Sequence, residues 1–431
     1  GITLGALAIY DSAPKQAEEV IKRSQEKIKI SMGEYRENGA FPEGPSYWAY
    51  GTTYNTLYFC ALESALKISF EPEKHQTFIK SANYIKHLTG PTQQYFNYSD
   101  GSVNRLPNWI NYWFAKQLKD SDLLSSENEI LKAYLENDSN QTNRFFALTP
   151  FFYLENTAIE QKQSSFLSFI DNGQNPIACH RNSWADNNTA FVAIKGGSPS
   201  ANHGHMDIGS FIFELDGVRW AEDLGSADYN MLESKGLNIW DKNQNSDRWK
   251  IFRYHNKSHN TLMINNNGQN VKNKSIFTSH YSTHEKKFSI INMQPSYQGQ
   301  LKVANRGFLL TPEETLVIQD EVALAEMESE LRWSFLTRAE VNIDGSKAIL
   351  KMKNKEICVQ ILEPNQVKFE FYEAENPGNH WDQENKGAKM LGFTLTLKGN
   401  EVNRIVVQFS KKDKQNSKEK IIPLKDWDKK E

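Results

Sequence analysis

FIFELDGVRWAED, residues 211–223, decides how the second half of this chain folds. Apolar and polar residues alternate on both sides of Asp216-Gly217, a dipeptide typical of two-residue hairpin turns. The pairs expected across this turn are Leu215 with Val218, Glu214 with Arg219, and Phe213 with Trp220. Because successive side chains of a strand point to opposite faces, one face should be apolar and enter the core. That face carries Phe211, Phe213, Leu215, Val218 and Trp220, and the opposite face carries Glu214, Arg219 and Asp223. The stretch therefore predicts an antiparallel β hairpin.

Further strand-like segments surround the hairpin, at 189–197, 259–269, 315–324 and 404–410. Asp-Gly or Asn-Gly turns recur at 216–217, 267–268 and 344–345. Such turns between alternating segments are a strong short-range signal for hairpins. We therefore expect residues 169–431 to form a large antiparallel β-sandwich with a charged C-terminal tail.

The residues before about position 165 have the periodicity of amphipathic helices instead. The expected helices span 17–32, 56–68, 75–88, 108–118, 127–137 and 144–154. Several helices of similar length joined by loops indicate an (α/α) toroid over residues 1–168, with a plain helical bundle as the alternative. The opening GITLGALAIYDS reads as the middle of a domain, so we expect the toroid to be incomplete at its start. The expected fold class is α+β with two domains.

Composition excludes some classes of partner. The chain has 431 residues and a net charge of −3, so it has no overall positive field for nucleic acid or an anionic membrane surface. No apolar run is long enough to span a membrane, and no secretory signal peptide is recognisable. The three cysteines are too few and too widely spaced for a disulfide framework. The abundant aromatic residues suit either carbohydrate binding or an aromatic-rich core.

A pair of histidines lies just before the hairpin, in His203-Gly204-His205. Residues two apart on an extended strand project from one face, so the two imidazoles are expected side by side. Asp223 follows across the hairpin, and His259 opens a later strand-like segment. Two imidazoles and one carboxylate are a suitable ligand set for zinc with an open fourth position. The alternative is a hydrogen-bonded polar cluster that organises strand ends.

The segments that carry these residues are similar to a known family. Three of them are NSWADNNTAFVAIKGG at 182–197, NHGHMDIGSFIFELDGVRWAEDLGSADYN at 202–230 and RWKIFRYHNKSHNTLMINNNGQ at 248–269. Together they resemble the C-terminal domain of the heparinase II/III-like polysaccharide lyases. FPEGPSYWAYGTTYNTLYFCALESAL at 41–66 and YFNYSDGS at 95–102 resemble the helical domain of the same family.

This resemblance implies a helical toroid packed on a β-sandwich, with the active site in the cleft between them. By resemblance, His205, Asp223 and His259 match the metal ligands, with zinc the usual ion, and His203 matches the catalytic histidine. It also implies an acidic polysaccharide or oligosaccharide as substrate. A periplasmic or secreted location in a bacterium would follow.

The chemistry of such a lyase directs attention to tyrosines. β-Elimination at a uronic acid needs a neutralised carboxylate, a base for the C5 proton and an acid for the departing glycosidic oxygen. Lyases of this architecture commonly use Tyr and His for the last two tasks. Tyr95 and Tyr98 are the candidates, and the Ser-Asp-Gly turn after Tyr98 is expected to expose it.

The segment around Glu43 and several cations complete the candidate site. Two prolines and a glycine stiffen that loop and hold the carboxylate in place. The remaining substrate-binding candidates are Tyr47, Trp48, Tyr50, Arg105, Arg181 and Asn202. Residues 241–257 are locally basic, through Lys242, Arg248, Lys250, Arg253 and Lys257, and would supply an anion-binding patch. Some family members carry a histidine just before the equivalent of Glu43, where this chain has none.

Two other functions fit the same residues. The absent histidine suits a non-catalytic glycan-binding protein on a degenerate lyase frame. A glycoside hydrolase is the second alternative, although hydrolysis needs two opposed carboxylates and Glu43 is the one candidate. The identity of the uronic acid, its linkage and the oligomeric state are left open by the sequence.

Overall fold

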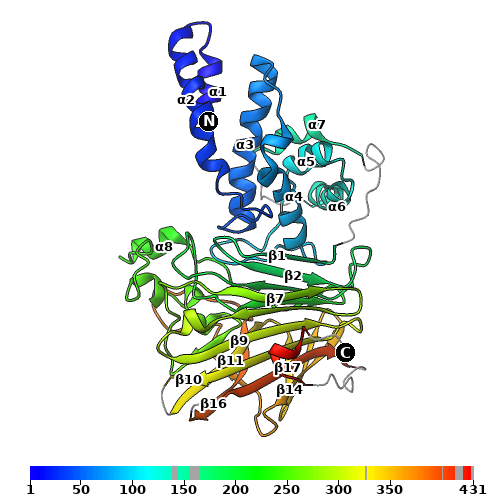
Figure 1. Cartoon of the computed structure of the whole chain (residues 1–431), viewed down its shortest axis with the longest axis vertical. Coiled ribbons are helices and arrows are strands. Elements are labelled where there is room, and N and C mark those ends of the chain that lie inside the picture. The colour runs from blue at the N-terminus through cyan, green and yellow to red at the C-terminus, as the bar shows by residue number, and fades with distance from the viewer. Residues whose placement is uncertain (138–143, 156–165, 326–327, 400, 413–420, 429–431) are drawn as a thin grey trace. The chain divides into compact units, whose positions relative to one another are not determined.

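The chain folds into two compact units, one of helices and one of sheets (Figure 1). The computed structural model describes residues 1–137, 144–155, 166–325, 328–399, 401–412 and 421–428. The helical unit comprises residues 1–88 and 104–165, and the β unit comprises residues 89–103 and 166–431. Among the described helices, none has the length and apolar character needed to cross a membrane.

The helical unit follows the predicted order of helices. Its described helices are α1 (Ile2–Ala8), α2 (Pro14–Met32), α3 (Pro45–Leu66), α4 (Gln76–Leu88), α5 (Ile110–Leu118), α6 (Asp122–Glu136) and α7 (Thr149–Phe152). α3 begins well before the predicted residue 56, because Gly44 adopts a φ of 93° and Pro45 has the fixed φ that suits a first helical position. The helix expected at 144–154 is instead a 3₁₀ turn followed by the single turn of α7.

The β unit contains three sheets, and every strand pairing among its described residues is antiparallel. The five-stranded sheet has the order β1 (Ser168–Asp171), β2 (Ile177–Arg181), β3 (Phe191–Lys195), β4 (Phe211–Leu215), β5 (Val218–Ala221). The eight-stranded sheet has the order β12 (Glu340–Asp344), β13 (Lys347–Met352), β14 (Lys355–Glu363), β17 (Asn403–Lys411), β10 (Leu316–Leu324), β9 (Leu301–Leu310), β8 (Lys287–Asn292), β7 (Ile276–Ser282). The four-stranded sheet has the order β15 (Glu370–Tyr372), β16 (Lys389–Lys398), β11 (Glu328–Thr337), β6 (Leu262–Ile264). The short helix α8 (Tyr229–Ser234) follows β5.

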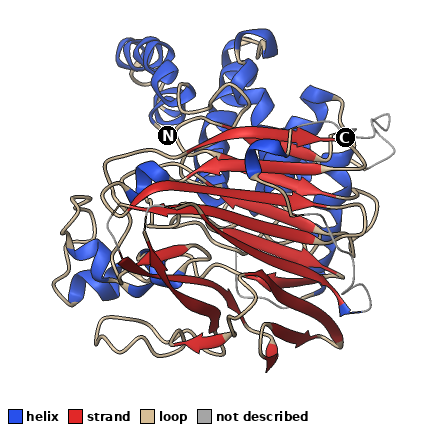
Figure 2. Ribbon diagram, turned by 60° about the horizontal axis from the view of Figure 1, so that its bottom comes forward, coloured by secondary structure: helices blue, strands red, loops and turns tan. Residues whose placement is uncertain are grey.

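One hydrophobic core joins the three sheets, whose strands are drawn in red in Figure 2. Phe213 of the five-stranded sheet contacts Phe409 of the eight-stranded sheet, with ring centroids 5.6 Å apart. Phe335 of the four-stranded sheet contacts the same Phe409 at 5.0 Å. Aromatic pairs at these separations add specific geometry to the burial of apolar area. The predicted α+β layout with a C-terminal antiparallel β domain is thus confirmed.

Strands β4 and β5 form the predicted hairpin with the predicted turn. Their pairing register shifts between Glu214 and Phe213. Asp216 and Gly217 both have positive φ, of 55° and 72°, as a type I′ turn requires. Leu215 pairs with Val218 and Glu214 with Arg219, as predicted. The predicted pairing of Phe213 with Trp220 is wrong, since a β-bulge makes Ala221 the partner of Phe213. The five apolar side chains predicted for the core face are all buried in the core.

The opposite face of this hairpin is covered by residues 89–103. Glu214 and Arg219 form a buried ion pair with 2.6 Å between Oε1 and Nη2. The Thr92 amide donates to Glu214, and Arg219 donates to the Tyr95 carbonyl at 2.9 Å. These additional hydrogen bonds are what a buried pair needs to offset its lost hydration. Residues 89–103, which the sequence-based division placed in the helical domain, therefore fold with the sheets.

Candidate functional site

The two histidines of the His-Gly-His string lie in the loop between β3 and β4. Their predicted placement on an extended strand is wrong, because His203 has a left-handed φ of 56° and the Gly204 amide closes a turn onto the Ala201 carbonyl at 2.9 Å. A Cβ at Gly204 would overlap the carbonyl oxygen of Pro199, so only glycine fits this turn. The two imidazoles are brought together by a shared partner instead of by strand geometry.

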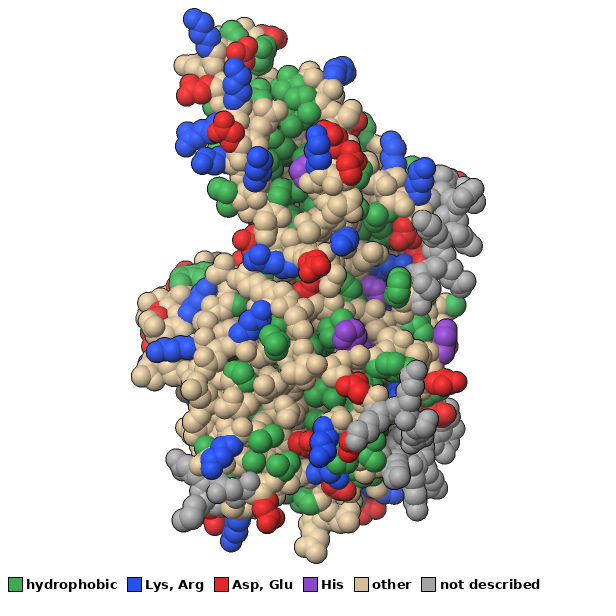
Figure 3. Space-filling view, in the orientation of Figure 1, with side chains coloured by type: hydrophobic (Ala, Val, Ile, Leu, Met, Phe, Trp, Pro, Cys, Tyr) green, Lys and Arg blue, Asp and Glu red, His purple; other side chains and the backbone are tan. Residues whose placement is uncertain are grey.

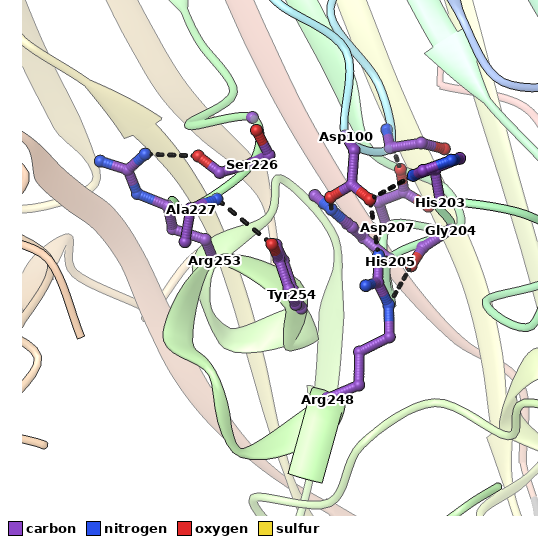
Figure 4. A network of polar contacts seen from close by, with 12 residues as sticks. Asp100, His203, Gly204, His205, Asp207, Ser226, Ala227, Arg248, Arg253 and Tyr254 are labelled. Carbon is purple, nitrogen blue, oxygen red and sulfur yellow. Dashed lines mark hydrogen bonds and ion pairs between the residues drawn. The ribbon is translucent and has the colours of Figure 1, made fainter. Parts of the chain in front are cut away.

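That partner is Asp100, from the segment that covers the hairpin (Figure 4). Asp100 Oδ2 lies 3.0 Å from His203 Nδ1, and Oδ1 lies 2.9 Å from His205 Nε2. Arg248 Nη2 donates to Asp100 Oδ2 at 3.1 Å. Burial alone would raise the pKa of Asp100, but the hydrogen bonds from both histidines and the charge of Arg248 hold it well below its ordinary value. Asp100 is therefore a fixed anion at the centre of the cluster.

Arg248 fixes the loop that carries the two histidines by hydrogen bonds to its backbone. Its Nε and Nη2 donate to the Gly204 carbonyl at 3.0 and 2.9 Å, and its guanidinium lies 4.3 Å from the Tyr254 ring centroid. Arg253 is similarly engaged, since its Nη1 donates to the Ser226 carbonyl at 2.6 Å. The predicted basic patch at 241–257 is therefore wrong for these two arginines, because both bind backbone carbonyls; Arg248 is buried and Arg253 is partly buried.

A second buried carboxyl group, on Asp207, fixes the turn that carries Asp100. Asp207 Oδ2 accepts the Ser99 amide at 3.2 Å, and Oδ1 lies 3.4 Å from the ammonium of Lys195. Lys195 Nζ in turn lies 5.6 Å from the ring centroid of Tyr98. The expected exposure of Tyr98 is wrong: the turn after it forms, but the side chain is only 1% exposed because its ring packs inward beside Lys195. Tyr95 is also buried, in an isolated bridge to Thr89.

The three expected metal ligands lie close together in the interior of this site. His259 Nδ1 is 2.7 Å from Asp223 Oδ2, and the rings of His205 and His259 have centroids 5.3 Å apart. His205 Nδ1 and His259 Nε2 are buried and have no hydrogen-bond partner among the described residues. Two orphaned imidazole nitrogens fit a metal that prefers nitrogen donors.

The carboxylate fits this set less directly. Asp223 Oδ2 already bonds His259, as carboxylates do when they orient a metal-binding imidazole. Within the described part of the chain, no three His, Cys, Asp or Glu side chains are arranged as a complete ligand group. In this arrangement Asp223 orients the His259 ring.

His203 is the member of the cluster nearest to the surface, with a side chain 19% exposed. Its Nδ1 lies 3.2 Å from the Tyr229 hydroxyl, and its ring centroid lies 5.8 Å from that of Trp240. Trp240 is 48% exposed, so one face of its ring meets solvent beside His203. Lys242 Nζ donates to the exposed Asn202 at 2.6 Å on the same loops. These groups form what we call the His203 surface: Asn202, His203, Tyr229, Trp240 and Lys242.

Sequence reasoning missed Tyr229 and Trp240. Tyr229 follows the Asp-Leu-Gly string by only a few residues, and Trp240 directly precedes the basic stretch at 241–257. Their signal was an aromatic residue beside charged and polar ones, which also describes many core positions. Figure 3 shows acidic and basic side chains interspersed over the drawn face of the β unit, so charge alone did not mark the place.

Six of the sequence candidates lie elsewhere. Glu43, Tyr47, Trp48, Tyr50 and Arg105 belong to the helical unit, and Arg181 belongs to β2. Trp48 is fully buried and stacks on Phe114, so its prediction as a sugar-stacking surface is wrong.

The two arginines are engaged inside the protein. Arg105 pairs with the buried Glu127 at 3.1 Å, and Arg181 is buried and donates to the Thr89 carbonyl at 2.7 Å. Both guanidinium groups are thus bound by groups of the protein itself. Tyr50 is exposed and Glu43 is partly buried at the start of α3, so both remain candidates.

Residues 181–418 match the sequence pattern of a protein family described as heparinase II/III-like, C-terminal. The chain belongs to the heparinase II/III-like family. The matched range contains His203, His205, Asp223 and His259. Asp100 lies outside it, although it folds into the β unit and joins both histidines of the string. No curated protein sequence matches the chain.

Solved structures of similar fold cover nearly all of this heparinase II/III-like chain. Heparan sulfate lyase HepC from Pedobacter heparinus superposes with a TM-score of 0.66 at 14% identity, over 95% of this chain and 58% of that one. A heparinase III structure gives 0.67 at 12% identity, over 95% and 60%. A heparinase III, the BT4657 gene product, gives 0.65 at 14% identity, over 95% and 58%. The chain thus spans less than two thirds of the length of these proteins, and at these identities the likeness shows the fold.

Proposed function

We propose that this chain is the catalytic part of a lyase that cleaves a uronic-acid-containing polysaccharide by β-elimination. The observation that carries the proposal is the Asp100 cluster, which holds His203 at the surface beside an exposed tryptophan. Membership of the heparinase II/III-like family supports it. So do similar structures described as a heparan sulfate lyase and heparinase III. The substrate is then a glycosaminoglycan or a related acidic glycan.

His203 is proposed as a general acid or base in this reaction. Asp100 accepts from the imidazole at Nδ1 and so orients the ring, as a carboxylate does for many catalytic histidines. Arg248 and the Gly204 turn fix the loop that presents it. Preorganisation of this kind contributes to rate because the group does not have to be ordered at each turnover.

Tyr98 is proposed as the second proton-transfer group, with Tyr95 as the alternative. Tyr98 lies two residues before Asp100, and its ring centroid lies 5.6 Å from the ammonium of Lys195. Tyr98→Phe retains the ring and removes the hydroxyl, so it should lower kcat while leaving the fold intact. Equal loss in Tyr95→Phe alone would move the assignment to Tyr95.

The His203 surface is proposed to meet the sugar. Trp240 offers a flat ring for stacking, and Lys242 with Asn202 offers a cation and an amide for the uronate carboxylate. Glu43, Tyr47 and Tyr50 of the helical unit are proposed as further substrate contacts by resemblance. A substrate of this kind also implies a periplasmic or secreted protein.

A divalent metal, zinc by its ligand chemistry, is proposed to bind His205 and His259, with Asp223 supplying the carboxylate of the set. When bound, it would tie together the loops that carry these residues. Calcium suits two imidazoles poorly.

Metal analysis of the purified protein should find about one zinc per chain, and none in His205→Ala. Chelation should lower the thermal midpoint of the native protein and leave that of the variant unchanged. A metal-free native protein, or a variant that retains the metal, would contradict this assignment.

Incubation with heparan sulfate, chondroitin sulfate and alginate tests the activity itself. Unsaturated products support β-elimination, saturated products support a glycoside hydrolase, and binding without product supports a non-catalytic glycan-binding protein. The cluster itself does not favour hydrolysis, because Asp100, Asp207 and Asp223 are each buried and bound to a histidine or lysine.

A further inference from the structure

The β unit has a cavity of about 590 Å³ that shares none of its lining residues with the His203 surface. Its wall is formed by twelve residues: Met206, Gln244, Asn245, Ser246, Trp249, Lys250, His255, Asn267, Gly268, Asn270, Gln298 and Gln300. Its volume lies within the usual range for small-molecule sites, roughly 300–1,000 Å³. Half of its lining residues are carboxamides: Gln244, Asn245, Asn267, Asn270, Gln298 and Gln300. The cavity is therefore polar without being strongly charged.

The charges at the cavity wall are balanced or suppressed. Lys250 is the one charged side chain among the lining residues, and its Nζ is bound by Asp247 Oδ1 at 2.7 Å. Burial, helped by the charge of Lys257, lowers the pKa of His255 to about 3, so its ring is neutral near pH 7. No carboxylate lines the described wall. An anionic ligand would find no unpaired cation here, and a cationic ligand would find no anion.

Several polar groups of the wall have unused hydrogen-bonding capacity. Ser246 is only 7% exposed, and its Oγ has no hydrogen-bond partner among the described residues. The same holds for the buried Oε1 of Gln300. His255 Nδ1 accepts the Lys257 amide at 3.2 Å, so the neutral ring carries its proton on Nε2 as a donor. Buried polar atoms in native proteins nearly always have partners, so these groups point to a ligand.

We propose that this cavity binds an uncharged sugar unit of an oligosaccharide. Sugar hydroxyls both donate and accept, and the wall offers both functions through the carboxamides, Ser246 and His255. Trp249 and Met206, both largely buried, form the apolar part of the wall. They directly follow Arg248 and His205 in the chain, so this second site lies beside the candidate catalytic cluster. The proposal does not depend on the lyase reaction.

Calorimetric titration of the full chain with cellobiose and with N,N′-diacetylchitobiose tests the proposal. At least one of them should bind with a saturable isotherm. Ser246→Ala and Asn245→Ala should each weaken that binding about three- to tenfold, the usual effect of one hydrogen bond. Ser246→Ala should retain the native thermal midpoint, because the hydroxyl has no hydrogen-bond partner in the described protein. Asn342→Ala, an exposed position on β12, is the matched control and should bind as the native protein does.

Absence of saturable binding with both sugars would overturn the proposal, as would binding that neither variant weakens. Trp240→Ala provides a further arm. If it abolishes neutral-sugar binding while Ser246→Ala and Asn245→Ala do not, the sugar occupies the His203 surface and the proposal is wrong. Because neither cavity variant alters His203 or Asp100, a failure here is separable from a failure of the proposed lyase activity.

Discussion

At the scale of single residues, Asp100 explains how the two histidines take different places. One oxygen holds His203 near the surface and the other holds His205 in the interior. These hydrogen bonds, together with the charge of Arg248, hold the pKa of Asp100 well below its ordinary value. The hydrogen bonds from these partners offset the hydration that the buried carboxylate loses. The division of labour between the two histidines therefore depends on a residue a hundred positions earlier in the chain.

Gly204→Ala should disturb this arrangement through the backbone. The new Cβ would overlap the Pro199 carbonyl oxygen. This is a backbone atom, so it cannot move aside as the end of a flexible side chain could. We expect a loss of about 1–3 kcal/mol in the free energy of unfolding, typical of overpacking, together with loss of activity. Gly5→Ala is the control, since a Cβ there meets nothing within 4 Å and the residue is helical. Denaturant unfolding that gave the same stability for both variants would contradict the steric argument.

At the scale of elements, residues 89–103 connect the hairpin to the site. They cap the Glu214–Arg219 ion pair and carry Tyr95, Tyr98 and Asp100 with them. Arg219→Met should cost about 3–5 kcal/mol, because it leaves Glu214 buried and unpaired. Hydrogen exchange of the amides at 92–100 should accelerate by more than tenfold at the same time.

Arg404→Met is the matched control for that experiment. Arg404 is partly exposed and lies 3.8 to 3.9 Å from its acidic partners, so its loss should cost less than about 1 kcal/mol. If both variants lost the same stability, the ion pair under residues 89–103 would not be what holds this segment.

The junction of β1, β2 and β8 should be sensitive to acid through His180. Its ring bonds Ser168 and Ser289 at 2.7 Å each, and burial, with the nearby charges of Lys287 and His280, lowers its pKa to about 3. The unfolded chain has a pKa near 6.5 for histidine, so protonation favours unfolding and this stability, complete above about pH 6.5, is lost as pH falls toward 3. Between pH 7 and 5 the loss should be about 2 kcal/mol. His180→Asn should remove that part of the slope in urea unfolding curves, and an unchanged slope would contradict it.

At the scale of the whole molecule, sequence patterns predicted the architecture more accurately than they predicted the individual contacts. The change from helical to strand periodicity, and turns such as Asp216-Gly217, depend on local chemistry and were confirmed. The bulge opposite Phe213 and the burial of Glu214 and Arg219 depend on what covers the sheet, which no local pattern contains. Residues 89–103 were misplaced for the same reason.

The residues of the candidate site differ in the same way: some were predictable from a local motif, and others depend on contacts with distant parts of the chain. His205, Asp223 and His259 were predicted as a group and do lie together, because the motif that carries them belongs to one domain. Their function as metal ligands stays a prediction. Asp100 and Trp240 were missed, since the first is distant in sequence and the second resembles a core residue. Trp48, Arg105 and Arg181 were chosen by residue type, and the structure buries them.

The central claim is that His203, held by Asp100, transfers a proton in β-elimination. The direct measurement is the near-ultraviolet absorbance of the new C4–C5 double bond when the full chain is incubated with the uronate panel. The account predicts absorbance with at least one substrate, a kcat about 100-fold lower or more in His203→Ala with a native-like thermal midpoint, and a raised KM in Trp240→Ala. No unsaturated product from any uronate, or full activity in His203→Ala, would contradict it.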